Sequence, residues 1–297
     1  MTLRDFALMV VVCLIWASSN VVSKYVVSHL GVPPLFFAGV RFVLVALATA
    51  PWLMPAPKPL WRILTVGVLM GAGNFALLFI GLKTATPSSA AIVSQIGAPL
   101  TAVMSFLMLG ETMNRRRIFG VSLTALGVIL VMWDPRGFHA SMGLLFVLAA
   151  AFLGSLGAVM MKQMDGVKPL QFQAWVGFSS AVPLLIASAL FEPGAIEPAA
   201  AAGWRFAAAV GFSAIVVSVA AHTAYYGLIQ RYEANLVSPL TLMTPLFTIG
   251  MGVLFMHDPF GPRMALGTVV ALAGVLIVAL RFNQLVSLVL AMRPRAQ

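Results

Sequence analysis

Charged residues are the scarcest class in this sequence. Asp, Glu, Lys and Arg make up 9% of its 297 residues, whereas they make up about a quarter of a soluble domain. Apolar residues make up 61%, which leaves too little polar surface to cover a soluble globule of this size. The single cysteine, Cys13, excludes an intramolecular disulfide. The composition therefore excludes a soluble protein and indicates one that is embedded in a lipid bilayer.

Long apolar runs follow one another from one end of the sequence to the other. Ten of them are long enough to cross the roughly 30 Å hydrocarbon core of a bilayer as helices. The predicted spans are residues 5–27, 33–54, 60–83, 86–109, 115–134, 140–163, 168–190, 203–228, 235–256 and 262–282. Short joints rich in Pro and Gly separate most of them. The sequence thus predicts an all-α membrane protein with ten transmembrane helices.

Ten crossings put both ends of the chain on one side of the membrane, and the loop charges indicate which side. Cytoplasmic loops carry the excess of Lys and Arg. Twelve such residues fall on the side of the termini (Arg4, Lys58, Arg62, Arg115, Arg116, Arg117, Lys162, Lys168, Arg231, Arg281, Arg293 and Arg295), and five fall on the other side (Lys24, Lys83, Arg136, Arg205 and Arg263). We therefore expect both termini in the cytoplasm. This bias accounts for the net charge of +10, so no nucleic-acid partner is expected.

The fourth and ninth predicted spans share a sequence motif. Each has a Pro-Leu pair, beginning at Pro99 and at Pro245, and each reaches an acidic residue about a dozen positions later, Glu111 and Asp258. The glycines beyond the acid also correspond, Gly120 with Gly267 and Gly127 with Gly274. The chain is therefore predicted to consist of two related halves.

Each predicted half, residues 1–137 and 138–297, contains five spans. Because five is odd, the second half must enter the membrane from the opposite side, as an inverted repeat. Inverted repeats can exchange conformations, so that a site between them opens first to one side and then to the other. Pro99 and Pro245 each remove a backbone hydrogen bond at matching depth, so we interpret them as hinges. The alternative is a fixed kink that only shapes the packing.

The repeated Pro-Leu … Gly-Glu … Gly-x6-Gly-Val pattern resembles the EamA-type branch of the drug/metabolite transporter superfamily. The segment from Ile15 to Lys24 matches the first-helix signature of that branch. Within the branch, the sequence is most similar to bacterial aromatic amino-acid exporters. One departure is the pair His257-Asp258, where the second repeat usually reads Gly-Glu, and we infer no functional change from it. The resemblance implies a transporter in the inner membrane of a bacterium, with a small-molecule substrate.

Polar side chains within the spans are costly in a bilayer and indicate a site. The candidate substrate-binding residues are Trp16, Asn20, Arg41, Asn74, Phe75, Phe79, Gln95 and His222. Four of them, Asn20, Arg41, Asn74 and Gln95, lie at similar depth and predict a polar patch in a central cavity, with aromatic side chains around it. Alternatives remain open: the amides can bond between helices, Arg41 can reach the external surface, and His222 can be a packed histidine rather than a proton carrier.

The sequence lacks the motifs of an enzyme. It has no nucleophile elbow, no phosphate-binding loop and no pair of histidines at metal-ligand spacing, so no catalytic residue, metal or cofactor is expected. No Asp or Glu lies near the middle of a predicted span, which favours movement down the substrate gradient over ion coupling. We expect an exporter of small neutral metabolites, first of all aromatic amino acids. The alternatives are a drug or nucleotide-sugar carrier of the same fold, or a membrane-embedded enzyme or receptor. The oligomeric state stays open, and a monomer is compatible with the sequence.

Overall fold

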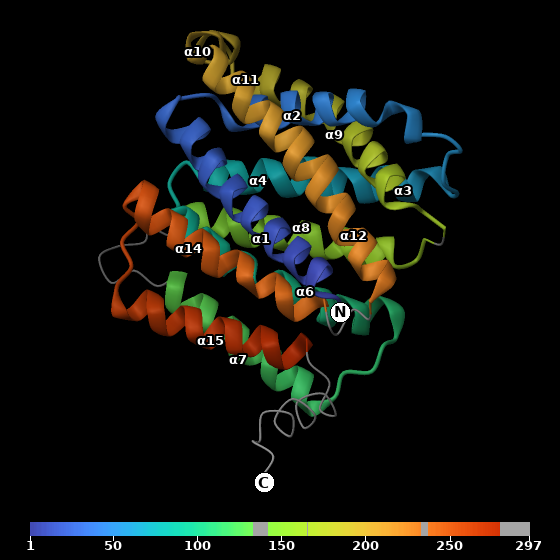
Figure 1. Ribbon diagram of the computed structural model, residues 1–297, viewed down its shortest axis with the longest axis vertical. Helices are drawn as coiled ribbons and strands as arrows, with labels where there is room; N and C mark the ends of the chain where they lie inside the picture. The colour runs from blue at the N-terminus through green and yellow to red at the C-terminus, as the bar shows by residue number, and fades with distance from the viewer. Residues whose placement is uncertain (133–141, 165, 233–236, 280–297) are drawn as a thin grey trace.

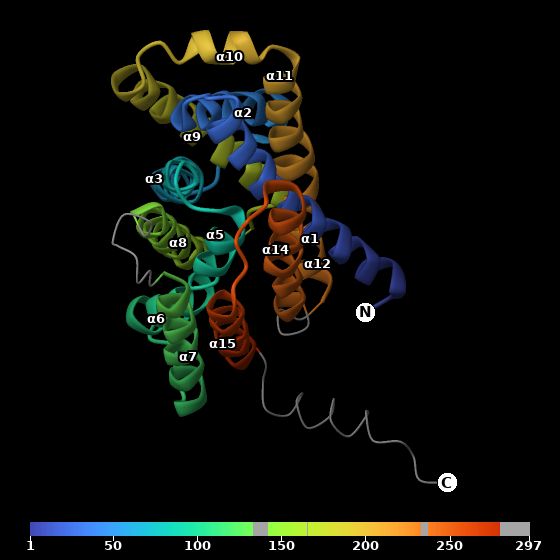
Figure 2. The same ribbon diagram turned by 90° about the vertical axis from the view of Figure 1, so that its left-hand side faces the viewer.

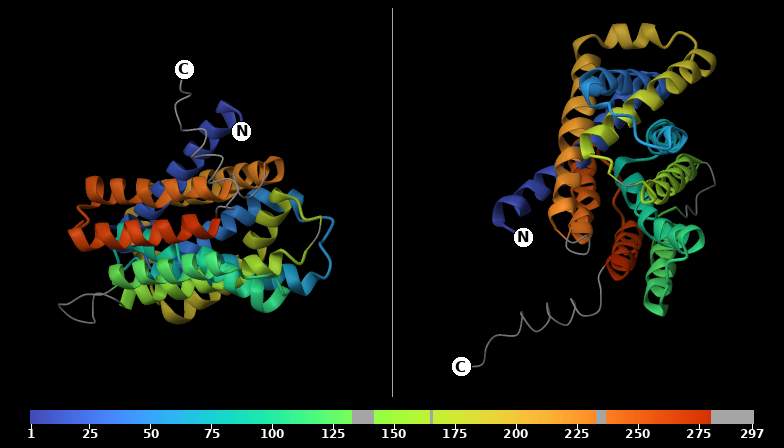
Figure 3. Two further views of the ribbon diagram at one scale, coloured as in Figure 1. Left: turned by 90° about the horizontal axis from the view of Figure 1, so that it is seen from below. Right: turned by 90° about the vertical axis from the view of Figure 1, so that its right-hand side faces the viewer.

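The computed structural model describes residues 1–132, 142–164, 166–232 and 237–279. Within these ranges every regular element is helical, and the helices lie side by side along one bundle (Figures 1 and 3). The predicted boundary between the halves, at residues 137 and 138, lies outside the described residues. So do four of the counted cations, Arg136, Arg281, Arg293 and Arg295.

The helices follow the order of the predicted spans. The first five spans contain α1 (Leu3–Lys24) with η1 (Tyr25–His29), α2 (Pro34–Thr49) with η2 (Ala50–Trp52), α3 (Leu60–Gly67) with η3 (Val68–Gly73) and α4 (Asn74–Gly81), α5 (Pro87–Ser94) with α6 (Gly97–Leu109), and α7 (Arg115–Met132). The second five contain α8 (Met142–Met161), α9 (Pro169–Phe191), α11 (Trp204–Gly211) with η5 (Phe212–Ala221) and α12 (His222–Arg231), η6 (Ser238–Leu242) with α14 (Met243–Met256), and α15 (Pro262–Ala279).

Eight of these helical stretches are long and apolar enough to cross a membrane. The ninth predicted span corresponds to the shorter apolar helix Leu240–Met256, and the fifth corresponds to α7, which begins with three arginines. The prediction of an all-α membrane protein is therefore confirmed. The short helix α10 (Ile196–Ala202) was not predicted, and it lies across the ends of the neighbouring helices (Figure 2).

Contacts along the helices show how several of them run relative to one another. Cys13 contacts Leu240 and Ser18 contacts Met251, so α1 and α14 run in the same direction. Helix α15 returns from the end of α14 and finishes at the end of the bundle where α1 begins, which we call the terminal end. The side chain of Lys24 reaches the carbonyl oxygen of Leu82, so α1 and α4 both finish at the other end, which we call the opposite end.

Helices α7 and α15 pack against each other through glycines (Figure 1). A Cβ atom at Gly120 would meet the backbone of Gly274, and one at Gly127 would meet the backbone of Gly267 and Ala271. The two helices are therefore antiparallel. Small residues let the backbones of membrane helices approach closely, and this approach replaces the hydrophobic driving force that is missing between helices in lipid.

Helices α2 and α9 form a second closely packed antiparallel pair. Gly39 of α2 lies against Leu185, and Gly177 of α9 lies against the backbone of Ala46. In both pairs, one helix comes from each predicted half of the chain. The two pairs hold the halves together beside the helices that line the centre of the molecule.

Candidate functional site

A cavity of about 470 Å³ lies at the middle depth of the bundle. Its wall is formed by residues of α1, η3, α4, α5, α6, α8, η5, α12 and α14, together with Gln95 between α5 and α6. The lining residues are Trp16, Ser19, Asn20, Met70, Asn74, Phe75, Leu78, Ala91, Ser94, Gln95, Gly97, Thr101, Ala150, Ala151, Gly154, Ser155, Val217, His222, Tyr225, Thr244 and Pro245. The volume lies in the range of small-molecule sites in proteins.

The structure brings most of the predicted site residues together around this cavity. Six of the eight line it, namely Trp16, Asn20, Asn74, Phe75, Gln95 and His222. The other two, Arg41 and Phe79, are 0% and 1% exposed and lie outside the lining. Of the two predicted hinges, Pro245 lines the cavity, whereas Pro99 is buried between the lining residues Gly97 and Thr101. None of these positions by itself tests a role in transport.

Arg41 lies behind the aromatic wall of the cavity. Its Nε and Nη2 atoms donate to Oγ of Ser218, at 3.2 and 2.9 Å. Its guanidinium carbon lies 4.2 Å from the centre of the Phe75 ring and 5.9 Å from that of Phe79. Such cation–π contacts stabilise a desolvated cation. Among the described residues the Nη1 atom has no hydrogen-bond partner, so the guanidinium has one buried nitrogen that is available to donate a further hydrogen bond.

Two of the predicted amides form hydrogen bonds between helices. Asn20 donates from Nδ2 to Oγ1 of Thr248 at 3.4 Å, and Asn74 donates from Nδ2 to the carbonyl oxygen of Ala150 at 2.7 Å. Gly154 makes room for Asn74, because a Cβ atom there would lie 2.7 Å from its amide nitrogen. Since an amide side chain has two N–H groups and an oxygen, both residues combine a structural contact with a position in the cavity wall.

Backbone irregularities place several of these side chains. The π-helical segments η3 and η5 end immediately before Asn74 and His222, and such wide turns occur frequently at functional sites. Nδ1 of His222 lies 2.7 Å from the carbonyl oxygen of Val217, five residues earlier. The fourth span is interrupted at Gln95, between α5 and α6. Gln95 lies four residues before Pro99, and because proline has no backbone N–H, the helical hydrogen bond to the Gln95 carbonyl is missing.

Three aromatic rings form a cluster on one side of the cavity. The ring centres of Trp16 and His222 are 5.2 Å apart, and those of Trp16 and Tyr225 are 5.0 Å apart with the planes at 69°. Sequence reasoning did not select Tyr225 as a site residue. The signal was present, because Ser218, His222 and Tyr225 share one helical face. Among the described lining residues none is Asp, Glu, Lys or Arg.

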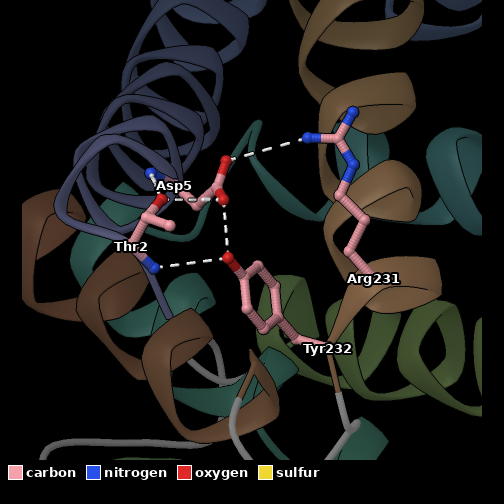
Figure 4. Close-up of polar contacts among 4 residues, drawn as sticks. All are labelled: Thr2, Asp5, Arg231 and Tyr232. Carbon is pink, nitrogen blue, oxygen red and sulfur yellow. Dashed lines mark hydrogen bonds and ion pairs between the residues drawn. The ribbon is translucent and has the colours of Figure 1, made fainter.

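A polar cluster joins two lining helices at the terminal end (Figure 4). Oδ2 of Asp5 accepts hydrogen bonds from the hydroxyl of Tyr232 at 2.6 Å and from that of Thr2 at 2.9 Å. Arg231 approaches the other carboxylate oxygen to 3.8 Å. The cluster therefore connects the start of α1 with the end of α12, away from the cavity itself.

Several known proteins are similar to this chain. Probable amino-acid metabolite efflux pumps of Salmonella typhimurium and Escherichia coli are 27% and 26% identical to it, each over 93% of this chain and 95% of the relative. An S-adenosylmethionine/S-adenosylhomocysteine transporter of Chlamydia trachomatis is 23% identical over 84% of this chain and 81% of its own length. A protein of known crystal structure superposes with a TM-score of 0.62 at 18% identity, covering 93% of this chain and 97% of the other, which shows a shared fold.

The family model that matches the sequence covers nearly all of it, at residues 5–133 and 141–280. Its description, an EamA-like transporter family, agrees with the helical bundle, with the central cavity and with the names of the relatives. The chain therefore belongs to the EamA-like transporter family, and it is a multi-pass membrane transporter rather than an enzyme.

Proposed function

We propose that the protein exports amino acids, first of all aromatic ones, across the inner membrane of a bacterium. The observation that carries this proposal is the cavity wall, which combines amide side chains with aromatic rings and, among the described lining residues, has no charged group. A small zwitterion with an apolar side chain matches such a wall. The names of the two relatives that handle amino-acid metabolites support the same substrate class.

Each part of an aromatic amino acid has a candidate partner in the cavity wall or directly behind it. The amides of Asn20, Asn74 and Gln95 would accept hydrogen bonds from the ammonium group through their oxygens. The rings of Trp16 and Phe75 would pack against the side chain. The carboxylate would be directed towards the guanidinium of Arg41, which lies over the Phe75 ring. To contact this group, the carboxylate would have to pass the edge of that ring. A sugar nucleotide has at least two negative charges, and the lining residues that the structure describes include no Lys or Arg to meet them.

We further propose that the halves 1–137 and 138–297 alternate the access to this cavity. The family model matches the chain in two segments, one in each half. The antiparallel pairs α7–α15 and α2–α9 each combine one helix from each half, as two inverted repeats require. Pro99 and Pro245 are the proposed hinges. Pro245 lines the cavity and Pro99 lies beside it, so bending there would change the shape of the cavity.

Transport by this mechanism would follow the gradient of the substrate alone, because neither half supplies a carboxylate in mid-membrane for a driving ion. The experiment is uptake of radiolabelled phenylalanine into proteoliposomes, with and without an imposed proton or sodium gradient. We expect the same initial rate in each case. Acceleration by a proton gradient that is lost in His222→Ala and kept in His29→Ala would contradict the facilitative mechanism and assign proton coupling to His222.

A further inference from the structure

Two acidic residues occupy equivalent positions at opposite ends of the bundle. Glu111 follows α6 and Asp258 follows α14, and the sequence repeat aligns them. Each comes directly after a residue in the left-handed conformation, Gly110 with φ of 67° and His257 with φ of 55°. The backbone N–H of each acid then bonds back into its helix, to Ser105 and to Gly252. The same helix-ending turn therefore presents both carboxylates.

Two lysines are equivalent in the same way. Lys24 ends α1 and Lys162 directly follows α8, the first helices of the two halves. Lys24 and Lys162 are separated by the same number of residues as Gly39 and Gly177. These glycines lie in α2 and α9, which are the second helices of the two halves. Each lysine lies at the same end of the bundle as the acid of the other half. The molecule therefore has two equivalent cation–carboxylate sets, one at each end.

At the terminal end the set forms an ion pair. Nζ of Lys162 lies 3.4 Å from Oε1 of Glu111 and donates to Oγ of Ser105 at 3.0 Å. This contact ties α8 to the end of α6, and it crosses from one half of the chain to the other. Both side chains are about half exposed, at 48% and 40%, so the pair is accessible and contributes modest free energy.

At the opposite end the equivalent groups are apart. Oδ2 of Asp258 accepts hydrogen bonds from the backbone N–H and the hydroxyl of Ser88, at 2.9 and 2.5 Å. Nζ of Lys24 donates to the carbonyl oxygens of Leu82 and Lys83, at 2.8 and 3.2 Å. Lys24 and Asp258 form no ion pair with each other among the described residues. The lysine and the carboxylate thus lie at the same end of the bundle, and each is bonded to other groups.

We propose that Lys162–Glu111 and Lys24–Asp258 are alternating latches of the transport cycle. Two inverted repeats exchange their conformations between the two access states, so a contact made by one half in one state is made by the other half in the second state. In the second state Lys24 leaves the carbonyls and pairs with Asp258, while the pair at the terminal end separates. Both latches close pairs of helices whose inner faces line the cavity. This inference rests on the alternating access proposed above.

The proposal predicts that weakening one latch closes the other. The test uses Cys13→Ser protein with Lys24→Cys and Asp258→Cys, and a short bifunctional maleimide that joins the two cysteines in membranes. Glu111→Gln weakens the pair at the terminal end and should raise the rate of this cross-linking about two- to five-fold, as expected for a partly exposed ion pair. Arg115→Gln, which changes an exposed charge nearby, is the matched control and should leave the rate unchanged.

In the reverse experiment the cross-link is formed at the terminal end and the latch at the opposite end is weakened. This experiment leaves Asp258 unchanged, so its contact with Ser88 is kept. Here Glu111→Cys and Lys162→Cys report on the terminal end, and Lys24→Gln weakens the latch at the opposite end. Cross-linking should again rise about two- to five-fold, and the control Lys83→Gln should have no effect. An unchanged rate in Lys24→Gln, or an equal rise in Lys83→Gln, would overturn the proposal. Because cross-linking needs no substrate, a failure to transport amino acids would leave this result interpretable.

Discussion

The guanidinium carbon of Arg41 lies 4.2 Å from the centre of the Phe75 ring, and Phe75 lines the cavity whereas Arg41 does not. If a substrate carboxylate interacts with this cation, Arg41→Gln should weaken amino-acid transport by about ten- to a hundred-fold, since a hydrogen bond to a charged group is worth roughly 1.5–3 kcal/mol. An aromatic amine without the carboxylate should lose much less. The measurement is competition by each compound against labelled phenylalanine in proteoliposomes.

Ser218→Ala is the matched control for this substitution. It removes the hydroxyl that accepts from Arg41 and keeps the charge, so it should change transport of the acid and of the amine by the same factor. Equal losses for the acid and the amine in Arg41→Gln would mean that Arg41 supports the packing of Phe75 and does not interact with the carboxylate.

The two proposed hinges can be tested together. Pro99→Ala with Pro245→Ala restores two amide donors and should straighten both helices. We expect slower transport at a near-normal yield of folded protein, measured by liposome uptake and by gel filtration. Pro183→Ala is the control, because Pro183 also lies inside a helix, α9, that does not line the cavity. If the double variant transports like the control, both prolines shape the packing only.

The glycine contact between α7 and α15 should be sensitive to a single methyl group. In Gly127→Ala the new carbon would overlap the backbone of Ala271, and overpacking of this kind costs about 1–3 kcal/mol. In Gly250→Ala in α14 the new carbon meets nothing within 4 Å in the part of the chain that the structure describes, and the change should be neutral or stabilising by up to about 1 kcal/mol. Thermal unfolding in detergent should therefore show a lower Tm for the first variant alone.

The orientation in the membrane follows from the loop charges. A reporter fused after Gln297 should behave as cytoplasmic, and one inserted between Glu192 and Glu197 should behave as periplasmic. Alkaline phosphatase and a fluorescent protein, which are active on different sides, would give opposite signals at the two sites. A periplasmic C-terminus would contradict both the topology and the inverted repeat of five-helix halves.

Sequence reasoning predicted the helices well, because the length and polarity of a span are set by the bilayer and are visible in any run of residues. The predicted span 115–134, for example, corresponds to Arg115–Met132. It missed α10, because a short alanine-rich helix that contains Pro198 in its first turn has no strong periodic signal. It also missed the π-helical turns η3 and η5, which arise from packing against other helices rather than from local propensity.

The candidate site was predicted in part. The depth of Asn20, Asn74 and Gln95 along their helices indicated a common location, and the structure places all three on one cavity. Depth does not tell which way a side chain points once neighbouring helices have packed. Arg41 has the predicted depth but is covered by Phe75, since the rotation of α2 is set by its close contact with α9.

The glycine contact has a further consequence for how such a chain can arise. Gly120, Thr124 and Gly127 of α7 have the same spacing as Gly267, Ala271 and Gly274 of α15, and the antiparallel arrangement sets Gly120 against Gly274 and Gly127 against Gly267. The surface is therefore complementary to itself under a half-turn in the membrane plane. A polypeptide of half this length would therefore already present both sides of this contact to an upside-down copy of itself, and fusing the two copies would preserve the contact.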